Sequence, residues 1–292
     1  MSLNPVIILG MHRSGTSLVA SCLEDLGLFI GNKKDTNSEA WFFLNLNNWM
    51  LRQTNASWDN PYNFQFLNAT IREQIIRVTE FHLKNFFTRQ KYLGLSKSLK
   101  YKSIKDLDFP WGWKDPRNTF TFEIWKDIFP EAKILHVYRH PADVIRSLQK
   151  REQIEKQETK RTNRRSFVNR VKEISTKGTV PYQLSVRAEN PDEGYKLWED
   201  YVNQAFLIEE EARNKIIHIK YENFVRYPER LLKKILLFLE MEKEPNQIGQ
   251  VIKKVNPDRI FAFLKHDETI EFFQKKYARK ELVEKLGYDQ IS

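Results

Sequence analysis

The 292-residue sequence has almost no cysteine and no long apolar run. Its single cysteine, Cys22, excludes a disulfide framework and favours a reducing compartment. The apolar run Val6–Leu9 is far too short for the core of a signal peptide, and no stretch approaches the length that spans a membrane. The six histidines show no metal-ligand spacing. We therefore expect a cytoplasmic protein with no membrane span and no metal site.

Acidic residues are fewer than basic ones, 38 against 48, which gives a formal net charge of +10. Such a surplus attracts anions, among them nucleotides, acidic sugars, nucleic acid and membrane surfaces, and does not choose between them. The hydrophobic content of 41%, with 20 Phe, 11 Tyr and 7 Trp, is sufficient for a large core. The chain is therefore expected to be globular.

The sequence has neither an internal repeat nor a Gly/Ser-rich linker, so we expect a single domain over residues 1–292. One segment departs from the rest: a basic excursion at about 150–185, most basic over Lys150–Lys177 and nearly free of large apolar residues. It fits a solvated helical face or mobile excursion, or a lid over an anionic substrate. Nucleic-acid binding is not expected, because no aromatic interleaving or reader motif accompanies the charge. Nothing in the sequence indicates the oligomeric state.

Strand and helix patterns alternate along the chain. Short apolar, β-branched runs bounded by turn residues are typical of buried parallel strands. The expected strands are Val6–Leu9, one ending at Tyr138 and one within "NKIIHIKYENF". The expected helices are 15–27, 70–88, 119–129, one beginning near Pro141 and 228–241. This alternation predicts an α/β fold with a mostly parallel central sheet flanked by helices.

The first strand leads into "GMHRSGTS", which has the two glycines of a nucleotide phosphate loop but not its lysine. Thr16 stands in the lysine's place, and Arg13 lies inside the loop. Gly10 and Gly15 permit the turn, and backbone N–H groups at the helix start, with hydroxyls from Thr16 and Ser17, favour an anion. The absent lysine argues against ATP or GTP and favours a smaller anion beside Arg13. The alternative is a tight turn that binds no ligand.

The stretch "YRHPADVIRS" also follows a strand and begins a helix. Arg139 stands at the strand end, and Ser147 follows eight residues later, about two helical turns into the helix. Such an arginine and serine would hold a second phosphate from two sides, with Arg146 nearby. The alternative is a surface turn with an incidental arginine.

Together the two motifs resemble those of sulfotransferases that use 3′-phosphoadenosine 5′-phosphosulfate (PAPS). "HRSGTS" resembles their 5′-phosphosulfate loop, and "YRHPADVIRS" resembles their 3′-phosphate element. "WGWKDPRN" and "IKYENFVRYPERLLKKILLFL" are similar to pieces of bacterial members, so the resemblance spans most of Pro5–Met241. It implies that the donor is bound by His12, Arg13, Ser14, Gly15, Thr16, Ser17, Arg139 and Ser147, with Arg259 in a C-terminal loop over the 3′-phosphate.

The resemblance also implies a P-loop-type three-layer fold and a reaction. A sulfuryl group would pass from PAPS to a hydroxyl or amine of a carbohydrate or small metabolite, an anionic one included, leaving 3′,5′-ADP (PAP) and needing no metal. Sulfuryl transfer is an in-line displacement, so the protein mainly positions groups and stabilises charge. Arg13 would neutralise the oxygen that bridges phosphate and sulfate, and Lys114 would be the second cation.

The general base is the least determined residue. Carbohydrate and tyrosyl-protein sulfotransferases carry a glutamate just over twenty residues after the loop cation, and none occupies the matching place here. Bacterial relatives have a glutamate where this chain has Phe43, and cytosolic members have a histidine where it has Pro116. The candidates are, in order, Asp35, Glu39, Asp115 and Asp59.

Two other functions stay open. A P-loop kinase or other NTPase requires a lysine before Ser17 and an acidic strand end for Mg²⁺, where the chain has Thr16 and Arg139. A non-catalytic nucleotide-bisphosphate-binding protein would retain both motifs without a base, and Phe43 is compatible with that.

Overall fold

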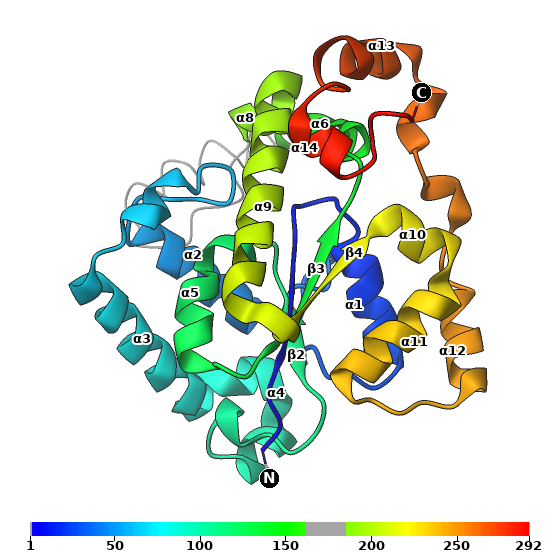
Figure 1. Ribbon diagram of the computed structural model, residues 1–292. Coiled ribbons are helices and arrows are strands. Elements are labelled where there is room, and N and C mark those ends of the chain that lie inside the picture. Colours follow the sequence, from blue (N-terminus) through cyan, green and yellow to red (C-terminus); the bar gives the residue numbers. More distant parts are fainter. Residues whose placement is uncertain (1, 162–184, 292) are drawn as a thin grey trace. The chain divides into compact units, whose positions relative to one another are not determined.

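Four parallel strands form a sheet in the order β2-β1-β3-β4 (Figure 1). The computed structural model describes residues 2–161 and 185–291. The strands are β1 (Val6–Leu9), β2 (Gly112–Lys114), β3 (Lys133–Tyr138) and β4 (Ile216–Lys220). Because all neighbouring pairs are parallel, the four carboxyl ends lie at one edge of the sheet.

The central strand β1 is buried on both faces, and its side chains alternate between two cores. Ile7 packs in a cluster with residues of α2 (Trp41–Arg52), α3 (Ala69–Lys84), α4 (Phe86–Lys100) and α5 (Asn118–Ile128). Val6 and Ile8 pack on the opposite side against α1 (Thr16–Asp25), α10 (Tyr221–Arg226), α11 (Pro228–Leu239) and α12 (Pro245–Ile252). A strand buried on both faces requires helices on both, and this confirms the P-loop-type three-layer α/β fold.

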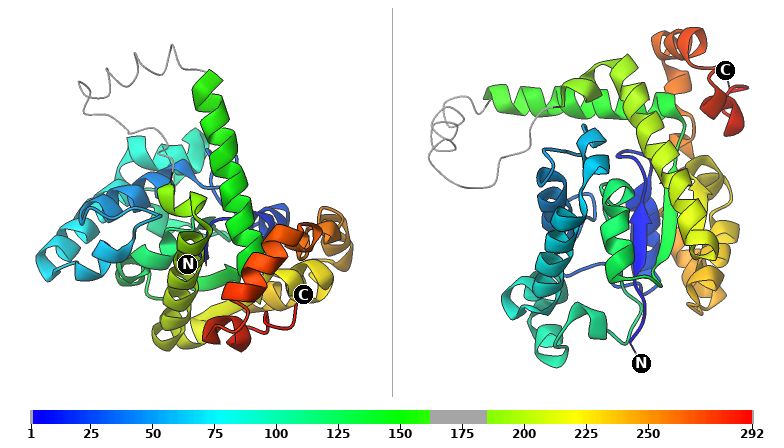
Figure 2. Two further views of the ribbon diagram at one scale, coloured as in Figure 1. Left: turned by 90° about the horizontal axis from the view of Figure 1, so that it is seen from above. Right: turned by 60° about the vertical axis from the view of Figure 1, so that its left-hand side comes forward.

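The chain divides into two compact units. Unit 1, Met1–His140 and Asp200–Ala262, holds the sheet and the helices named above. Its short 3₁₀ segments are η1 (Tyr62–Phe66), η2 (Ile104–Asp106), η3 (Arg213–Lys215) and η4 (Pro257–Arg259). In the right-hand view of Figure 2, α5 lies against the strands of this unit.

Unit 2 consists of Pro141–Glu199 and Phe263–Ser292. Its helices are α6 (Pro141–Arg161), α8 (Val186–Glu189), the first part of α9 (Pro191–Ala212), α13 (Asp267–Lys276) and α14 (Glu281–Lys285), and η5 (Ala262–Lys265) begins at its boundary. Asp143 in α6 accepts a hydrogen bond from the Phe263 backbone N–H at 2.8 Å, which joins the two segments of this unit. The single domain stays a prediction. Most of the basic excursion expected at about 150–185 falls on residues 162–184, outside the described residues.

The three expected strands and the helix that begins at Pro141 are confirmed. Strand β2 was not predicted, because only three residues pair and the string around them contains the turn signals Gly112 and Pro116. The helix expected over 70–88 ends at Lys84, since Asn85 caps the next helix by accepting from the Thr88 N–H. Across the described parts of the chain, no helix has both the length and the apolar character that crossing a membrane requires.

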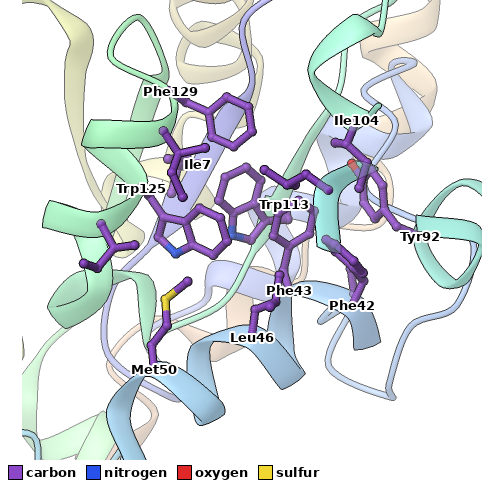
Figure 3. Packing of buried hydrophobic residues seen from close by; sticks show 14 of the residues in the cluster. Ile7, Phe42, Phe43, Leu46, Met50, Tyr92, Ile104, Trp113, Trp125 and Phe129 are labelled. Atoms are coloured by element: carbon purple, nitrogen blue, oxygen red, sulfur yellow. The ribbon is translucent and has the colours of Figure 1, made fainter. Parts of the chain in front are cut away.

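An aromatic stack fixes β2 against α2 (Figure 3). The rings of Phe43 and Trp113 are parallel, with centroids 3.9 Å apart, and both side chains are fully buried. Trp125 meets Trp113 edge-on at 4.9 Å. Phe43, where the resemblance leads us to expect a glutamate, is therefore a core residue. This packing sets the position of Lys114, the next residue of β2, and of Asn47, one helical turn further along α2.

Candidate functional site

The loop after β1 approaches its neighbours so closely that two of its positions require glycine. Gly10 has φ +134°, and a Cβ there would lie 2.1 Å from the Val137 carbonyl oxygen. Gly15 has φ +96°, and its Cβ would lie 2.2 Å from the ring of Tyr221. Arg13 also adopts a left-handed φ of 71° and is exposed. The loop thus packs between the end of β3 and the start of α10, with the first turn of α1 directly after it.

The predicted hydroxyls of this loop contact the protein itself. The buried Ser14 Oγ lies 2.6 Å from the Met11 carbonyl oxygen and 2.9 Å from that of Val137, so it fastens the loop to β3. Ser17 Oγ donates to the Asn37 carbonyl oxygen at 2.8 Å. Thr16 is buried as the first residue of α1. Anion binding here would therefore depend mainly on backbone N–H groups at the helix start.

His12 lies in an aromatic surrounding. Its ring meets Trp58 edge-on, with centroids 4.6 Å apart, and Tyr201 at 6.3 Å. The Tyr201 hydroxyl donates to the Trp58 carbonyl oxygen at 2.8 Å, which joins these two neighbours. The part of α9 that carries Tyr201 is thereby packed beside the loop.

A buried ion-pair cluster stands at the end of β2. Lys114 Nζ lies 2.9 Å from Glu39 Oε1, and Arg117 Nη1 lies 3.2 Å from Glu39 Oε2. Lys114 is only 2% exposed. Burial alone would raise the pKa of Glu39, but the charges of Lys114 and Arg117 lower it below its ordinary value. The sequence named Glu39 and Lys114 separately, and the structure brings them together. Arg117 is an ion-pair partner of Glu39 in this cluster.

Asp115 is held by a second layer of hydrogen bonds. Its Oδ1 accepts from Arg117 Nη1 at 2.9 Å, and its Oδ2 accepts from Asn47 Nδ2 at 2.8 Å. Asn118 extends the network by accepting from Asn47 at 2.8 Å. Burial raises the pKa of the fully enclosed Asp115 carboxyl, and Arg117 opposes that rise. In this environment Asp115 orients Arg117.

Asp35 organises the turn that leads to Glu39. Its Oδ1 accepts from the backbone N–H groups of Asn37 at 2.9 Å and of Glu39 at 2.7 Å. Since Ser17 donates to the carbonyl of the same Asn37, this turn is fastened to α1. Asp35 therefore helps to hold the Glu39 backbone in place.

Arg139 follows β3 directly and is largely buried. Its Nη2 donates to the Arg259 carbonyl oxygen at 2.6 Å, and its guanidinium lies 4.5 Å from the centre of the Tyr221 ring. The sequence expected Arg139 and Arg259 at one phosphate, and the structure brings the backbone of η4 to Arg139. Ser147, the other expected partner, belongs to α6 of unit 2, and its role stays a prediction.

Three cations therefore stand at the carboxyl edge of the sheet, each beside a different strand. Arg13 follows β1, Lys114 ends β2 and Arg139 follows β3. In open α/β sheets this edge is where ligands bind. The arrangement suits a ligand with several anionic groups.

A comparison with protein-family models matches residues 5–245 to the sulfotransferase family. The chain belongs to the sulfotransferase family. Its general reaction is therefore the transfer of a sulfuryl group, and the chain is a transferase. A search of curated protein sequences found no match.

One of three similar solved structures supports this fold. The sulfotransferase domain from the curacin biosynthetic pathway matches with a TM-score of 0.52 at 16% identity, over 99% of each chain. The sulfotransferase domain from the Synechococcus PCC 7002 olefin synthase has a TM-score of 0.43 at 16% identity, over 90% of this chain and 84% of that one. A sulfotransferase from Alicyclobacillus acidocaldarius has a TM-score of 0.42 at 16% identity, over 91% and 97%. At 16% identity, the match to the curacin-pathway domain shows a shared fold and nothing further.

Sequence reasoning missed three residues of this region. Tyr221 lies between Gly15 and Arg139, and its position directly after a strand was a usable signal. Asn47 holds Asp115, and Tyr201 borders His12. No sequence signal marks these two, because their contacts depend on how α2 and α9 pack.

Proposed function

We propose that the chain transfers a sulfuryl group from PAPS to an acceptor hydroxyl or amine and releases 3′,5′-ADP. One observation carries this proposal: the glycine loop, the buried Lys114–Glu39 pair and the stacked Arg139 share the carboxyl edge of one sheet. A nucleotide with a phosphosulfate at one end and a phosphate at the other carries anionic groups that match these cations.

The residues fit such a donor. Backbone N–H groups at the start of α1, together with Arg13, would hold the 5′-phosphosulfate. Arg139 would hold the 3′-phosphate, with Ser147 and the η4 segment that contains Arg259 as further contacts. The Tyr221 ring lies beside both Gly15 and Arg139. This position supports two separate anion sites, one on each side of the ring.

Bound PAPS supplies a sulfuryl group joined to a phosphate leaving group. Arg13 and Lys114 would stabilise the negative charge that develops on the bridging oxygen, and the enclosed Lys114, already fixed in position, would do so without reorganisation. Arg13 is permanently charged and is a poor proton donor. Lys114, enclosed at the end of β2, is held in place by Glu39.

Glu39 is our choice for the general base. All three carboxylates already have partners, and Glu39 is itself only 4% exposed. Glu39 is preferred because it alone lies directly beside Lys114, the cation proposed for the sulfuryl group. The lowered pKa of Glu39 keeps it ionised at neutral pH and able to accept a proton. It also makes Glu39 a weak base, so the proton would move late, after the acceptor oxygen has begun to bond to sulfur.

Comparing how three nucleotides change the melting temperature tests the donor. At a ligand concentration 100 times its Kd, a ligand that binds only the folded chain adds about 2.7 kcal/mol of stability, a rise of roughly 5 °C or more. We expect this rise with 3′,5′-ADP and a smaller one with 5′-AMP or Mg-ATP. Stabilisation by Mg-ATP without stabilisation by 3′,5′-ADP would favour the kinase alternative instead.

Transfer of radiolabelled sulfate from PAPS, screened over neutral and anionic acceptors, tests the enzyme itself. A chain that binds 3′,5′-ADP tightly and labels no acceptor would fit the binding-protein alternative.

A further inference from the structure

A cavity of about 430 Å³ lies wholly within unit 1. Its walls come from the segment around η1, from α3 and α5, and from residues 200–207 of α9. The volume suits a small molecule of drug size rather than a long polymer.

The cavity adjoins the candidate site through α5. Thr119, in the first turn of this helix, accepts a hydrogen bond from the Gly10 N–H at 3.3 Å, and the next residue, Phe120, lines the cavity. The Phe120 ring packs edge-on against Tyr201 at 4.6 Å, and Tyr201 in turn borders His12 of the loop. A chain of ring contacts, from Phe120 to Tyr201 to His12, therefore links the cavity lining to the loop that would hold the sulfuryl donor.

The lining combines apolar with polar side chains and is partly open to solvent. Phe64, Leu67 and Phe120 contribute apolar surface. Tyr62 is 65% exposed and Leu207 is 53% exposed, although both are large side chains that normally pack inside. Exposed apolar side chains gathered around a cavity are typical of a ligand-binding site.

The charged groups on the described part of this lining do not favour an anion. Arg72 is its one cation, and its guanidinium already contacts Asp127 at 2.9 Å and Glu123 at 3.3 Å. Glu123 and Asp200 add two carboxylates to the same lining. The amides of Asn203 and Gln204 provide neutral hydrogen-bonding groups instead.

We infer that this cavity is the acceptor site and that it takes a neutral alcohol with an apolar ring body. This inference rests on the proposed function and narrows its acceptor, because an anionic glycan would meet the carboxylates of Glu123 and Asp200 beside the apolar part of the lining. The rings would lie against Phe120 and Leu207, and the hydroxyl would extend toward the loop at His12.

Two probes that share one ring system test the inference. 2-Naphthylmethanol is neutral, and 2-naphthoate has the same carbon skeleton with a negative charge. Their affinities would be measured by calorimetry with 3′,5′-ADP at saturation. We expect the alcohol to bind at least about tenfold more tightly, the equivalent of 1.4 kcal/mol. Equal affinities, or tighter binding of 2-naphthoate, would overturn the inference.

A matched pair of variants locates the binding. Leu207→Glu adds a charge to the cavity wall, whereas Leu237→Glu makes the same change on α11, where the side chain is 82% exposed and outside the lining. We expect Leu207→Glu to weaken 2-naphthylmethanol about tenfold, and Leu237→Glu to leave its affinity unchanged. Both positions are solvent-exposed, so both variants should fold.

The same titrations separate this inference from the proposed function. If both variants bind 3′,5′-ADP normally and Leu207→Glu still binds the alcohol as the wild type does, the cavity assignment is wrong and the donor site stands. If the wild type fails to bind 3′,5′-ADP, the proposed function fails and the acceptor role fails with it.

Discussion

Replacing Glu39 by glutamine removes the negative charge at the centre of the buried cluster while keeping the side chain's shape. In the native chain one carboxylate oxygen lies 2.9 Å from Lys114 Nζ and the other 3.2 Å from Arg117 Nη1. Lys114 would remain 2% exposed with its counter-charge lost. Leaving a buried charge without its partner costs about 3–5 kcal/mol.

We expect the low end of that range, about 3 kcal/mol, for two reasons. The glutamine carbonyl oxygen can still accept one hydrogen bond, and Arg117 keeps Asp115 at 2.9 Å. Turnover should fall by about 10²–10⁴ if Glu39 is also the general base, with the affinity for 3′,5′-ADP near normal.

Urea unfolding gives the stability change, and Glu229→Gln is the matched control. Glu229 also pairs with a lysine, Lys233, at 2.7 Å, but on the surface, where such pairs contribute little. Equal stability losses in the two variants would refute the buried ion pair. A stability loss without a fall in turnover would keep the ion pair and remove Glu39 as the base.

Three further results are expected. Gly15→Ala should lower the free energy of unfolding by at least about 1–2 kcal/mol, because its φ is +96° and its Cβ would meet Tyr221, whereas Gly249→Ala, with open space in α12, should not destabilise; equal effects in urea would contradict the close approach. Ser14→Ala should cost about 1–3 kcal/mol by removing the buried hydroxyl that lies between the Met11 and Val137 carbonyl oxygens, and an unchanged urea midpoint would show that these contacts contribute nothing. The folded-state pKa of Glu39 lies below its ordinary value of 4.5, so the contribution of its charge to stability is complete above pH 4.5 and is lost as the pH falls through the lower, folded-state pKa. The stability difference between wild type and Glu39→Gln should therefore shrink in acid, and a difference that stays constant with pH would argue against a stabilising Glu39 charge.

Three of the four strands and the positions of both candidate anion-binding segments could be predicted from the sequence because their signals are local. A buried parallel strand is a short apolar run, and Val6–Leu9 shows it unbroken between Pro5 and Gly10. Close contacts with Val137 and Tyr221 require the two loop glycines, Gly10 and Gly15. The sequence shows these glycines by their spacing, although it does not show the contacts.

The cluster at Lys114 could not be predicted as a unit. Glu39 and Lys114 lie 75 positions apart and meet only because the Phe43–Trp113 stack sets α2 against β2. Asp35 is the first candidate base from the sequence, but the structure favours Glu39 over it. The Asp35 carboxylate accepts hydrogen bonds from the backbone N–H groups of its own turn. The cavity wall near Tyr201 likewise depends on helix packing, which no local pattern records.

The ratio of the Kd for 5′-AMP to that for 3′,5′-ADP tests most directly whether Arg139 holds a second phosphate. Charge-assisted hydrogen bonds of about 1.5–3 kcal/mol correspond to a preference for 3′,5′-ADP of about 10- to 150-fold in the wild type. This preference should be largely lost in Arg139→Ala and partly kept in Arg139→Lys, which retains the charge. A wild-type chain that binds both nucleotides equally, or an Arg139→Ala variant that keeps the full preference, would contradict a PAPS-dependent transferase built on this edge of the sheet.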